Sequence, residues 1–328
     1  MFRQNATRLA FVALVGAGMV SLTGCNDDDD HVSQTQVAPQ AKSVVELAQS
    51  SAELSVLVEA VAAADLVSAL STQNENTPLT VFAPTNQAFT QLLTGLGMTK
   101  EQLLADKALL TKVLTYHVIP KAAVEKADIP LNQSLVSLNG AAFVIDDRLQ
   151  VKDSQGGIAN ISRTDLRSDN GIVHVIDRVL LPPMQSIAEI ASNNPDFSIL
   201  VEALAAVDLV ETFQQDGNFT VFAPTNAAFS ALLTELGLTK EQLFADEALL
   251  TTVLKYHVIP EQRVFASQIS AGQEVTSLQT GKFRLNTTTT ILDGRGRTAN
   301  LVLTDVQANN GVIHAIDRVI LPPLPPAP

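Results

Sequence analysis

Several residue types are scarce in this chain of 328 residues, and each scarcity excludes a kind of stabilisation or a class of function. The one cysteine is Cys25, so no intramolecular disulfide can form and stability has to come from packing. Lysine and arginine total 21 against 34 acidic residues, which gives a net charge of −13. Nucleic acid is therefore not an expected partner, because phosphate binding needs clustered basic side chains. Tryptophan is absent, and the only tyrosines are Tyr116 and Tyr256.

Sequence motifs for catalysis and cofactor binding are also missing. The chain contains no Gly-x-Ser-x-Gly, no phosphate loop, no dinucleotide fingerprint and no His-Glu-x-x-His. We therefore expect no enzymatic activity and no cofactor. The apolar fraction of 46% and the charged fraction of 17% indicate instead a chain that packs into globular domains.

What the chain does contain is a long internal repeat. The segment from Leu79 to Phe89 returns almost letter for letter from Phe219 to Phe229, an offset of 140 residues. Tyr116-His117 and Asn170-Gly171 recur at the same offset. A period of this length indicates a whole domain, because the units of stacked repeats are about 20–50 residues long. The predicted domains are residues 43–183 and 184–324, followed by a C-terminal tail at 325–328.

Residues 1–24 have the pattern of a secretion signal. A basic start precedes an apolar run from Leu9 to Val20, which is too short to span a bilayer as a stable helix. The following Leu22-Thr23-Gly24-Cys25 resembles the lipobox of bacterial lipoproteins, which predicts cleavage before Cys25 and its acylation. The lipid would then hold the protein in the membrane, at the outer membrane and cell surface or facing the periplasm. An ordinary signal peptide, or an uncleaved anchor with an incidental cysteine, is the alternative.

Residues 25–42 are polar and acidic, with four adjacent carboxylates at Asp27–Asp30. Like charges in such a run repel one another and stay solvated. This favours a flexible tether that holds the domains off the membrane. A calcium-binding or sorting role for Asp27–Asp30 is the alternative.

Each domain begins with helical patterns. Apolar residues recurring near a 3.6-residue period predict a helix over 43–70. Leu79 to Phe82 favours a strand that ends at Pro84, and Thr85 or Asn86 can cap the next helix. Further caps are expected at Thr99 and Asp106 and at their copies in the second domain, Thr239 and Asp246.

After Pro120 the pattern changes to short strands, expected at 135–138, 142–145, 149–151 and 158–163. The segment 172–181 is apolar on both faces and predicts a central strand. Helices that come first and strands that follow indicate an α+β fold rather than an alternating, doubly wound one.

Three sequence blocks, present in both repeats, resemble the fasciclin domain family. In the first repeat they are Thr80-Val81-Phe82-Ala83-Pro84-Thr85-Asn86, Tyr116-His117, and Asn170-Gly171 through Pro182. The resemblance implies two tandem fasciclin-type domains, each a compact β-sandwich or wedge with helices packed around it. It also implies non-catalytic adhesion and matrix association at the cell envelope, with protein or polysaccharide partners on the cell surface or matrix. A periplasmic binding or scaffolding module for a small ligand or glycan is the alternative function.

The resemblance also suggests where a partner would bind. In animal members of the family, an Asp-Ile pair before the closing block and the tyrosine-histidine region have been implicated in integrin binding. The matching pairs in this chain, Asp165-Leu166 and Asp305-Val306, depart from Asp-Ile. The candidate interaction residues are therefore Asp165, Leu166, Asp305, Val306, Tyr116, His117, Tyr256 and His257.

Four histidines are the remaining candidates for chemistry: His117, His174, His257 and His314. Zinc needs three or four converging ligands, whereas these histidines are expected singly in apolar strands. We therefore expect core histidines that hydrogen-bond a backbone carbonyl or a carboxylate, and no metal. A metal site and a catalytic role are the alternatives. By the same reasoning the two tyrosines bury their rings, and Asp165 and Asp305 are expected in surface turns.

Overall fold

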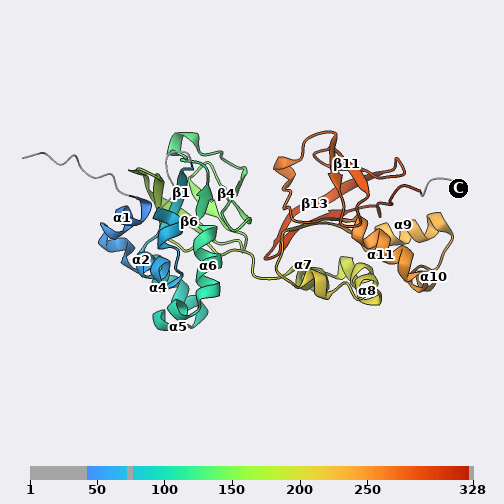
Figure 1. The fold of residues 1–328 in the computed structure, drawn as a ribbon, viewed down its shortest axis with the longest axis horizontal. Helices are drawn as coiled ribbons and strands as arrows, with labels where there is room; N and C mark the ends of the chain where they lie inside the picture. Colours follow the sequence, from blue (N-terminus) through green and yellow to red (C-terminus); the bar gives the residue numbers. More distant parts are fainter. Residues whose placement is uncertain (1–42, 72–76, 325–328) are drawn as a thin grey trace, which may run out of the picture. The chain divides into compact units, whose positions relative to one another are not determined.

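The computed structural model describes residues 43–71 and 77–324. The predicted signal, Cys25, Asp27–Asp30 and the C-terminal tail lie outside the described residues. Within the described residues, no helix has the length and apolar character needed to cross a membrane. In Figure 1 the first repeat is coloured blue to green and the second yellow to red.

The first repeat contains helices and strands in the predicted order (Figure 1). Its helices are α1 Val44–Gln49, η1 Ala52–Leu54, α2 Ser55–Ala63, α3 Val67–Ser71, α4 Asn86–Leu96, α5 Lys100–Ala105, α6 Lys107–Tyr116 and η2 Lys126–Asp128. Its strands are β1 Leu79–Pro84, β2 Val118–Pro120, β3 Ser134–Val136, β4 Ala142–Ile145, β5 Gln150–Lys152, β6 Ile158–Ser168 and β7 Gly171–Ile176.

The second repeat follows the same plan. Its helices are α7 Ile187–Asn193, η3 Pro195–Phe197, α8 Ser198–Ala206, η4 Glu211–Phe213, α9 Asn226–Leu236, α10 Lys240–Ala245, α11 Glu247–Tyr256 and η5 Ala266–Gln268. Its strands are β8 Phe219–Pro224, β9 Val258–Ile259, β10 Gln273–Thr276, β11 Lys282–Thr287, β12 Thr290–Leu292, β13 Thr298–Ala308 and β14 Gly311–Ile316.

The predicted helix caps are confirmed. The Thr85 side chain accepts a hydrogen bond from Ala88 N at the start of α4, and Asp106 does the same for Leu109 N in α6. Thr99 forms a full capping box with Gln102. Each cap satisfies a backbone N–H that has no partner inside the helix, which fixes where the helix begins.

The segment 43–70 is helical as predicted, and it is divided into α1, η1, α2 and α3. The chain leaves α2 through Asp65, which has a φ of 56°, a conformation that no helix interior contains. The short pieces still share one apolar face, so the residues of the expected face are buried although the axis turns. The helical period holds within each of these helices, and the breaks between them contain the polar residues Ser50, Ser51 and Asp65.

In each repeat the strands follow one continuous order, β2-β1-β7-β6-β5-β4-β3 in the first and the equivalent order in the second. β6 joins two parts of this order, since residues 158–160 pair with β5 and residues 161–168 pair with β7. Two register shifts within β6 mark the bend between these parts. The predicted α+β class, with helices packed against sheet, is confirmed.

The central strand β7 lies between β1, which runs parallel to it, and β6, which runs antiparallel. The strand ends at Ile176 and not at 181 as predicted, because Leu180 N and Leu181 N bond to side chains instead of a neighbouring strand. All six residues of β7 are buried, since apolar clusters cover both of its faces.

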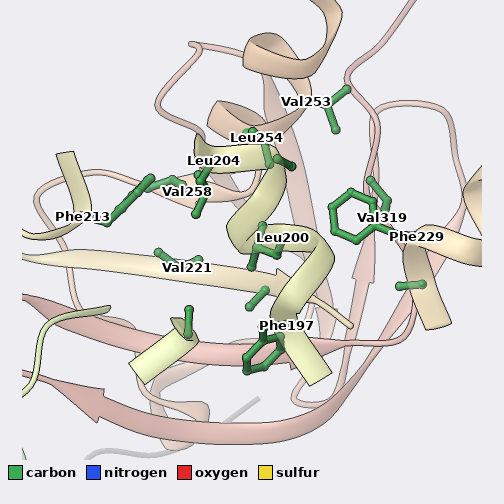
Figure 2. Packing of buried hydrophobic residues seen from close by; sticks show 14 of the residues in the cluster. Phe197, Leu200, Leu204, Phe213, Val221, Phe229, Val253, Leu254, Val258 and Val319 are labelled. Carbon is green, nitrogen blue, oxygen red and sulfur yellow. The ribbon is translucent and has the colours of Figure 1, made fainter. Parts of the chain in front are cut away.

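The helical side of the second repeat shows how the larger core is built (Figure 2). Leu200 and Leu204 of α8 lie over Val221 of β8, with Phe213 on one side of the cluster and Phe229 on the other. Burying a side chain of this size contributes about 1.5–3 kcal/mol. Because no disulfide is available, this packing is the main source of stability in each repeat.

Candidate interaction surface

The Asp-Leu and Asp-Val pairs lie on bulges of β6 and β13, not in surface turns after a strand. Asp165 has a φ of 60° and falls in the second register shift of β6, and Asp305 repeats both features in β13. The Asp165 carboxylate accepts a hydrogen bond from Lys126 N at 2.8 Å, and Asp305 accepts one from Ala266 N at 2.8 Å. The aspartates therefore fasten the bulge to the loop before η2 or η5.

A buried histidine forms the base of each bulge. His174 Nδ1 accepts a hydrogen bond from Asp165 N, and His174 Nε2 donates to Val124 O at 2.9 Å. His314 makes the equivalent bonds to Asp305 N and Val264 O. Burial lowers the pKa of His174 below its ordinary value, and the hydrogen bond to Val124 and the charge of Asp165 oppose this shift. A neutral imidazole with one donor and one acceptor matches these contacts.

We call the β6 and β13 bulge residues 162–167 and 302–307 the first and second corner. The second member of each predicted pair does not face solvent freely, since Leu166 and Val306 pack against the core. Both aspartates are half-buried. The exposed side chains of the corners are therefore mainly those of the neighbouring residues.

The exposed residues differ between the two corners. In the first corner, Arg163 pairs with Glu53 at 2.9 Å and Arg167 pairs with Glu125 at 2.6 Å. In the second corner, Val302 is 57% exposed and Leu303 is 50% exposed. The two copies thus present a charged surface and an apolar surface at the same place on the fold.

Tyr116 and His117 are buried below this surface, with 0% and 2% of their area exposed. Tyr116 donates its hydroxyl hydrogen to Ala142 O and accepts from Ser154 N. Tyr256 and His257 are equally buried, and burial raises the pKa of Tyr256 to about 12. In the folded domain a partner can therefore reach the half-buried aspartates of the corners but not the tyrosine-histidine pairs.

His117 connects the end of α6 to the segment after β7. Its Nδ1–H donates to Val113 O at 2.7 Å, and its Nε2 accepts from Leu180 N at 2.9 Å. His257 repeats this with Val253 O and Ile320 N. Burial lowers the pKa of His117 and of His257 to about 4 each, so both are neutral at physiological pH. The prediction of hydrogen-bonded core histidines is confirmed, but His117 and His257 lie at the C-terminal ends of α6 and α11 and not in strands as expected.

No group of three His, Cys, Asp or Glu side chains that could hold a metal ion occurs within residues 43–71 and 77–324. The buried polar side chains in the same part of the chain all have hydrogen-bond partners. The polar groups of the core are therefore engaged in holding the fold together.

Two asparagines have larger roles than the sequence indicated. Asn86 accepts from Val56 N and donates to Ala52 O, which ties α4 to the start of α2. Asn170 accepts from Val44 N and donates to Leu70 O, which ties the turn before β7 to the first helices. Their partners are distant in sequence, so a cap or a turn was the only interpretation that local spacing offered.

The comparison with known families decides the identity of the fold. The profile of the family described as Fasciclin domain matches residues 52–182 and 195–322. The chain belongs to the fasciclin domain family. This membership confirms that the repeat is a tandem pair of fasciclin domains.

Fasciclin proteins of different origin are similar to the chain. Transforming growth factor-beta-induced protein ig-h3 of Sus scrofa is 31% identical over 301 residues, which cover 89% of this chain and 39% of that protein. Protein sll1483 of Synechocystis is 42% identical over 154 residues, which cover 46% of this chain and 81% of that protein. The chain thus spans about two fifths of the length of its ig-h3 relative.

A solved fasciclin domain pair, from the insect cell adhesion molecule Fasciclin I, resembles the chain in structure. The two are 18% identical with a TM-score of 0.41, and the match covers 81% of this chain and 92% of that one.

Proposed function

We propose that this protein is a non-catalytic adhesion and matrix-interaction protein, anchored to a bacterial cell envelope through a lipid on Cys25. Its partners are proteins or polysaccharides at the cell surface or in the matrix. The proposal is supported by the tandem fasciclin domains, by the lipobox pattern before Cys25, and by the exposed residues of the second corner.

The observation that carries the proposal is the exposed apolar pair Val302 and Leu303. Two adjacent large apolar side chains at least half exposed are unfavourable in water, and contiguous apolar patches on soluble proteins mark sites of interaction. The pair lies in β13, where Leu303 is aligned with Ala315 of β14, whereas β12 pairs with β13 only over residues 298–300. The pairing with β14 holds the backbone of the apolar pair in place. A rigid backbone of this kind loses little conformational entropy when a partner binds.

The two corners differ in chemistry, which suits a protein that contacts its partner or matrix at two points. The first corner offers Arg163 and Arg167, and the second offers Val302 and Leu303. Two weak sites on one chain can together exceed either affinity by about 10²–10⁴ when both are engaged. The acidic tether and the lipid on Cys25 would keep both sites at the membrane.

The two repeats provide a matched variant for the test. Val302→Ser with Leu303→Arg places the first corner's own residues, Ser162 and Arg163, in the second corner. We expect cells that carry this variant to lose attachment to surfaces and matrix by at least about tenfold, as for loss of an interface hot spot. The fold should be kept, because the first repeat already accepts these residues on its bulge.

Leu236→Ser is the control, since Leu236 is an exposed apolar residue of α9 away from the corners. It should leave attachment unchanged. Equal attachment of the corner variant and the wild type, at equal surface amounts and melting temperature, would contradict the proposed site.

A further inference from the structure

The first repeat has an open hollow of about 270 Å³ between α4 and the segment after β7. Its walls are apolar, formed by Leu92 and Leu96 of α4 and by Val179 and Leu181. Arg178 contributes a guanidinium to the same hollow and is exposed to solvent. None of the residues that line the hollow belongs to either corner, and the hollow plays no part in the proposed adhesion.

In the second repeat the side chain of Arg297 occupies the position equivalent to this hollow. Arg297 donates to Glu235 on α9 at 2.9 Å and to Val319 O at 2.9 Å, and its side chain is only 15% exposed. Glu235 and Val319 correspond to Gly95 and Val179, which line the hollow of the first repeat. The second repeat therefore spans this place with an ion pair of its own.

Both members of the Arg297–Glu235 pair are glycine in the first repeat, whereas Asp293, which also pairs with Arg297 at 2.9 Å, is kept there as Asp153. Gly95 replaces Glu235 and Gly157 replaces Arg297. A Cβ atom at Gly95 would meet nothing within 4 Å, and one at Gly157 would lie 3.1 Å from Arg178 Nε. Asp153 Oδ2 is 2.6 Å from the same Cβ position. Arg178 and Asp153 thus lie at the point from which Arg297 starts in the second repeat, so a cation is kept while the carboxylate on α4 is missing.

Arg178 makes no ion pair or hydrogen bond with any residue of the described ranges 43–71 and 77–324. The nearby carboxylate of Asp153 already accepts hydrogen bonds from the backbone N–H groups of Gln155, Gly157 and Leu181. The cation at the hollow is therefore available to a carboxylate from outside the chain.

We propose that this hollow binds a small organic monocarboxylate with a short aliphatic or aromatic body. The carboxylate would take the place of the missing Glu235 equivalent and pair with Arg178, whose planar guanidinium suits two parallel hydrogen bonds. The apolar body would lie against Leu92, Leu96 and Val179. At about 270 Å³ the hollow is just below the usual range for ligand pockets, so the ligand is a small molecule.

Methyl-labelled protein provides the test, with benzoate and hexanoate as probes. We expect shifts in the methyl signals of Leu92, Leu96, Val179 and Leu181 on titration. The equivalent methyls of the second repeat, Leu232, Leu236, Val319 and Leu321, are the internal reference and should not move. Benzamide, which has the same shape without the charge, should bind at least about tenfold more weakly.

Three variants distinguish binding in the hollow from unspecific binding of carboxylic acids elsewhere on the protein. Arg178→Gln should weaken benzoate binding at least about tenfold, since a charge-assisted pair is lost. Gly95→Leu should abolish it by filling open space on α4, while also removing a glycine from a helix interior. Arg318→Gln, at the equivalent position of the second repeat, should change nothing.

The proposal is overturned if benzoate leaves the first-repeat methyls unmoved. It is also overturned if both repeats respond alike, or if Arg178→Gln and Gly95→Leu bind as the wild type does. Each variant is first checked for a wild-type melting temperature, so that loss of binding is not loss of fold. None of these outcomes bears on attachment, which depends on the corners.

Discussion

Mild acid should destabilise both repeats through His117 and His257. Each imidazole is buried and neutral, and its Nε2 accepts a backbone N–H from the segment after β7. Protonation would place a hydrogen on that accepting nitrogen, so that two donors would face each other in a site that solvent does not reach. The folded protein therefore resists protonation of these two histidines.

The sign and size of the effect follow from the two pKa values. The folded pKa of each histidine is about 4, below its ordinary value of 6.5, so the unfolded chain binds protons first as the pH falls. Stability is fully present above pH 6.5 and is lost between 6.5 and about 4. At about pH 5 the loss is about 2 kcal/mol per repeat, or about 6 °C in melting temperature.

Thermal and urea unfolding followed by circular dichroism at about pH 7.5, 6 and 5 measure this loss. The pair His117→Gln and His257→Gln is the control, because glutamine does not titrate. The variant starts less stable, and its stability should fall much less between pH 7.5 and 5. His174 and His314, whose pKa values burial also lowers, should supply the remaining slope. A wild-type melting temperature that is constant down to about pH 5 would refute the reasoning.

Two further predictions concern contacts that join distant segments. Asn86→Ala removes the hydrogen bonds to Val56 N and Ala52 O, and should lower the free energy of unfolding by about 2 kcal/mol in urea titrations; an effect below about 0.5 kcal/mol would show that the bonds are dispensable. Gly171→Ala would place a Cβ against Leu79 O where β7 runs beside β1, and should cost at least about 2 kcal/mol. A stable Gly171→Ala protein with wild-type melting would mean that the two strands can separate without loss.

The parts of the fold that local sequence controls could be predicted from the sequence. Thr85, Thr99 and Asp106 cap their helices because each accepts a hydrogen bond from an N–H group only three residues away. The apolar run of β7 predicted a central strand because both of its faces are covered. These features depend on neighbours along the chain, which the spacing displays directly.

The parts that depend on distant partners could not be predicted. Asn86 bonds to residues 30 and 34 positions away, and Asn170 bonds to a residue 126 positions away. The polar residues after 163 gave no strand pattern, although β6 continues to Ser168 through two register shifts. The apolar character of the second corner appeared only when Val302 and Leu303 were found to be exposed.

The hollow in the first repeat was equally hidden in the sequence. Gly95 and Gly157 are 62 positions apart, and nothing in their surroundings links them. Their relation becomes clear only beside the second repeat, where Glu235 and Arg297 form an ion pair at 2.9 Å. Comparison of the two repeats therefore reveals the hollow, because the second repeat contains the ion pair that is absent from the first.

Protease treatment of intact cells tests most directly whether the protein is a surface adhesin. The protease must not cross the outer membrane, and a Cys25→Ala variant is treated in parallel. We predict that the wild-type protein is digested on intact cells and that the variant is released or mislocalised. Protection of the wild type until the envelope is opened would contradict adhesion to outside partners and would place the protein in the periplasm.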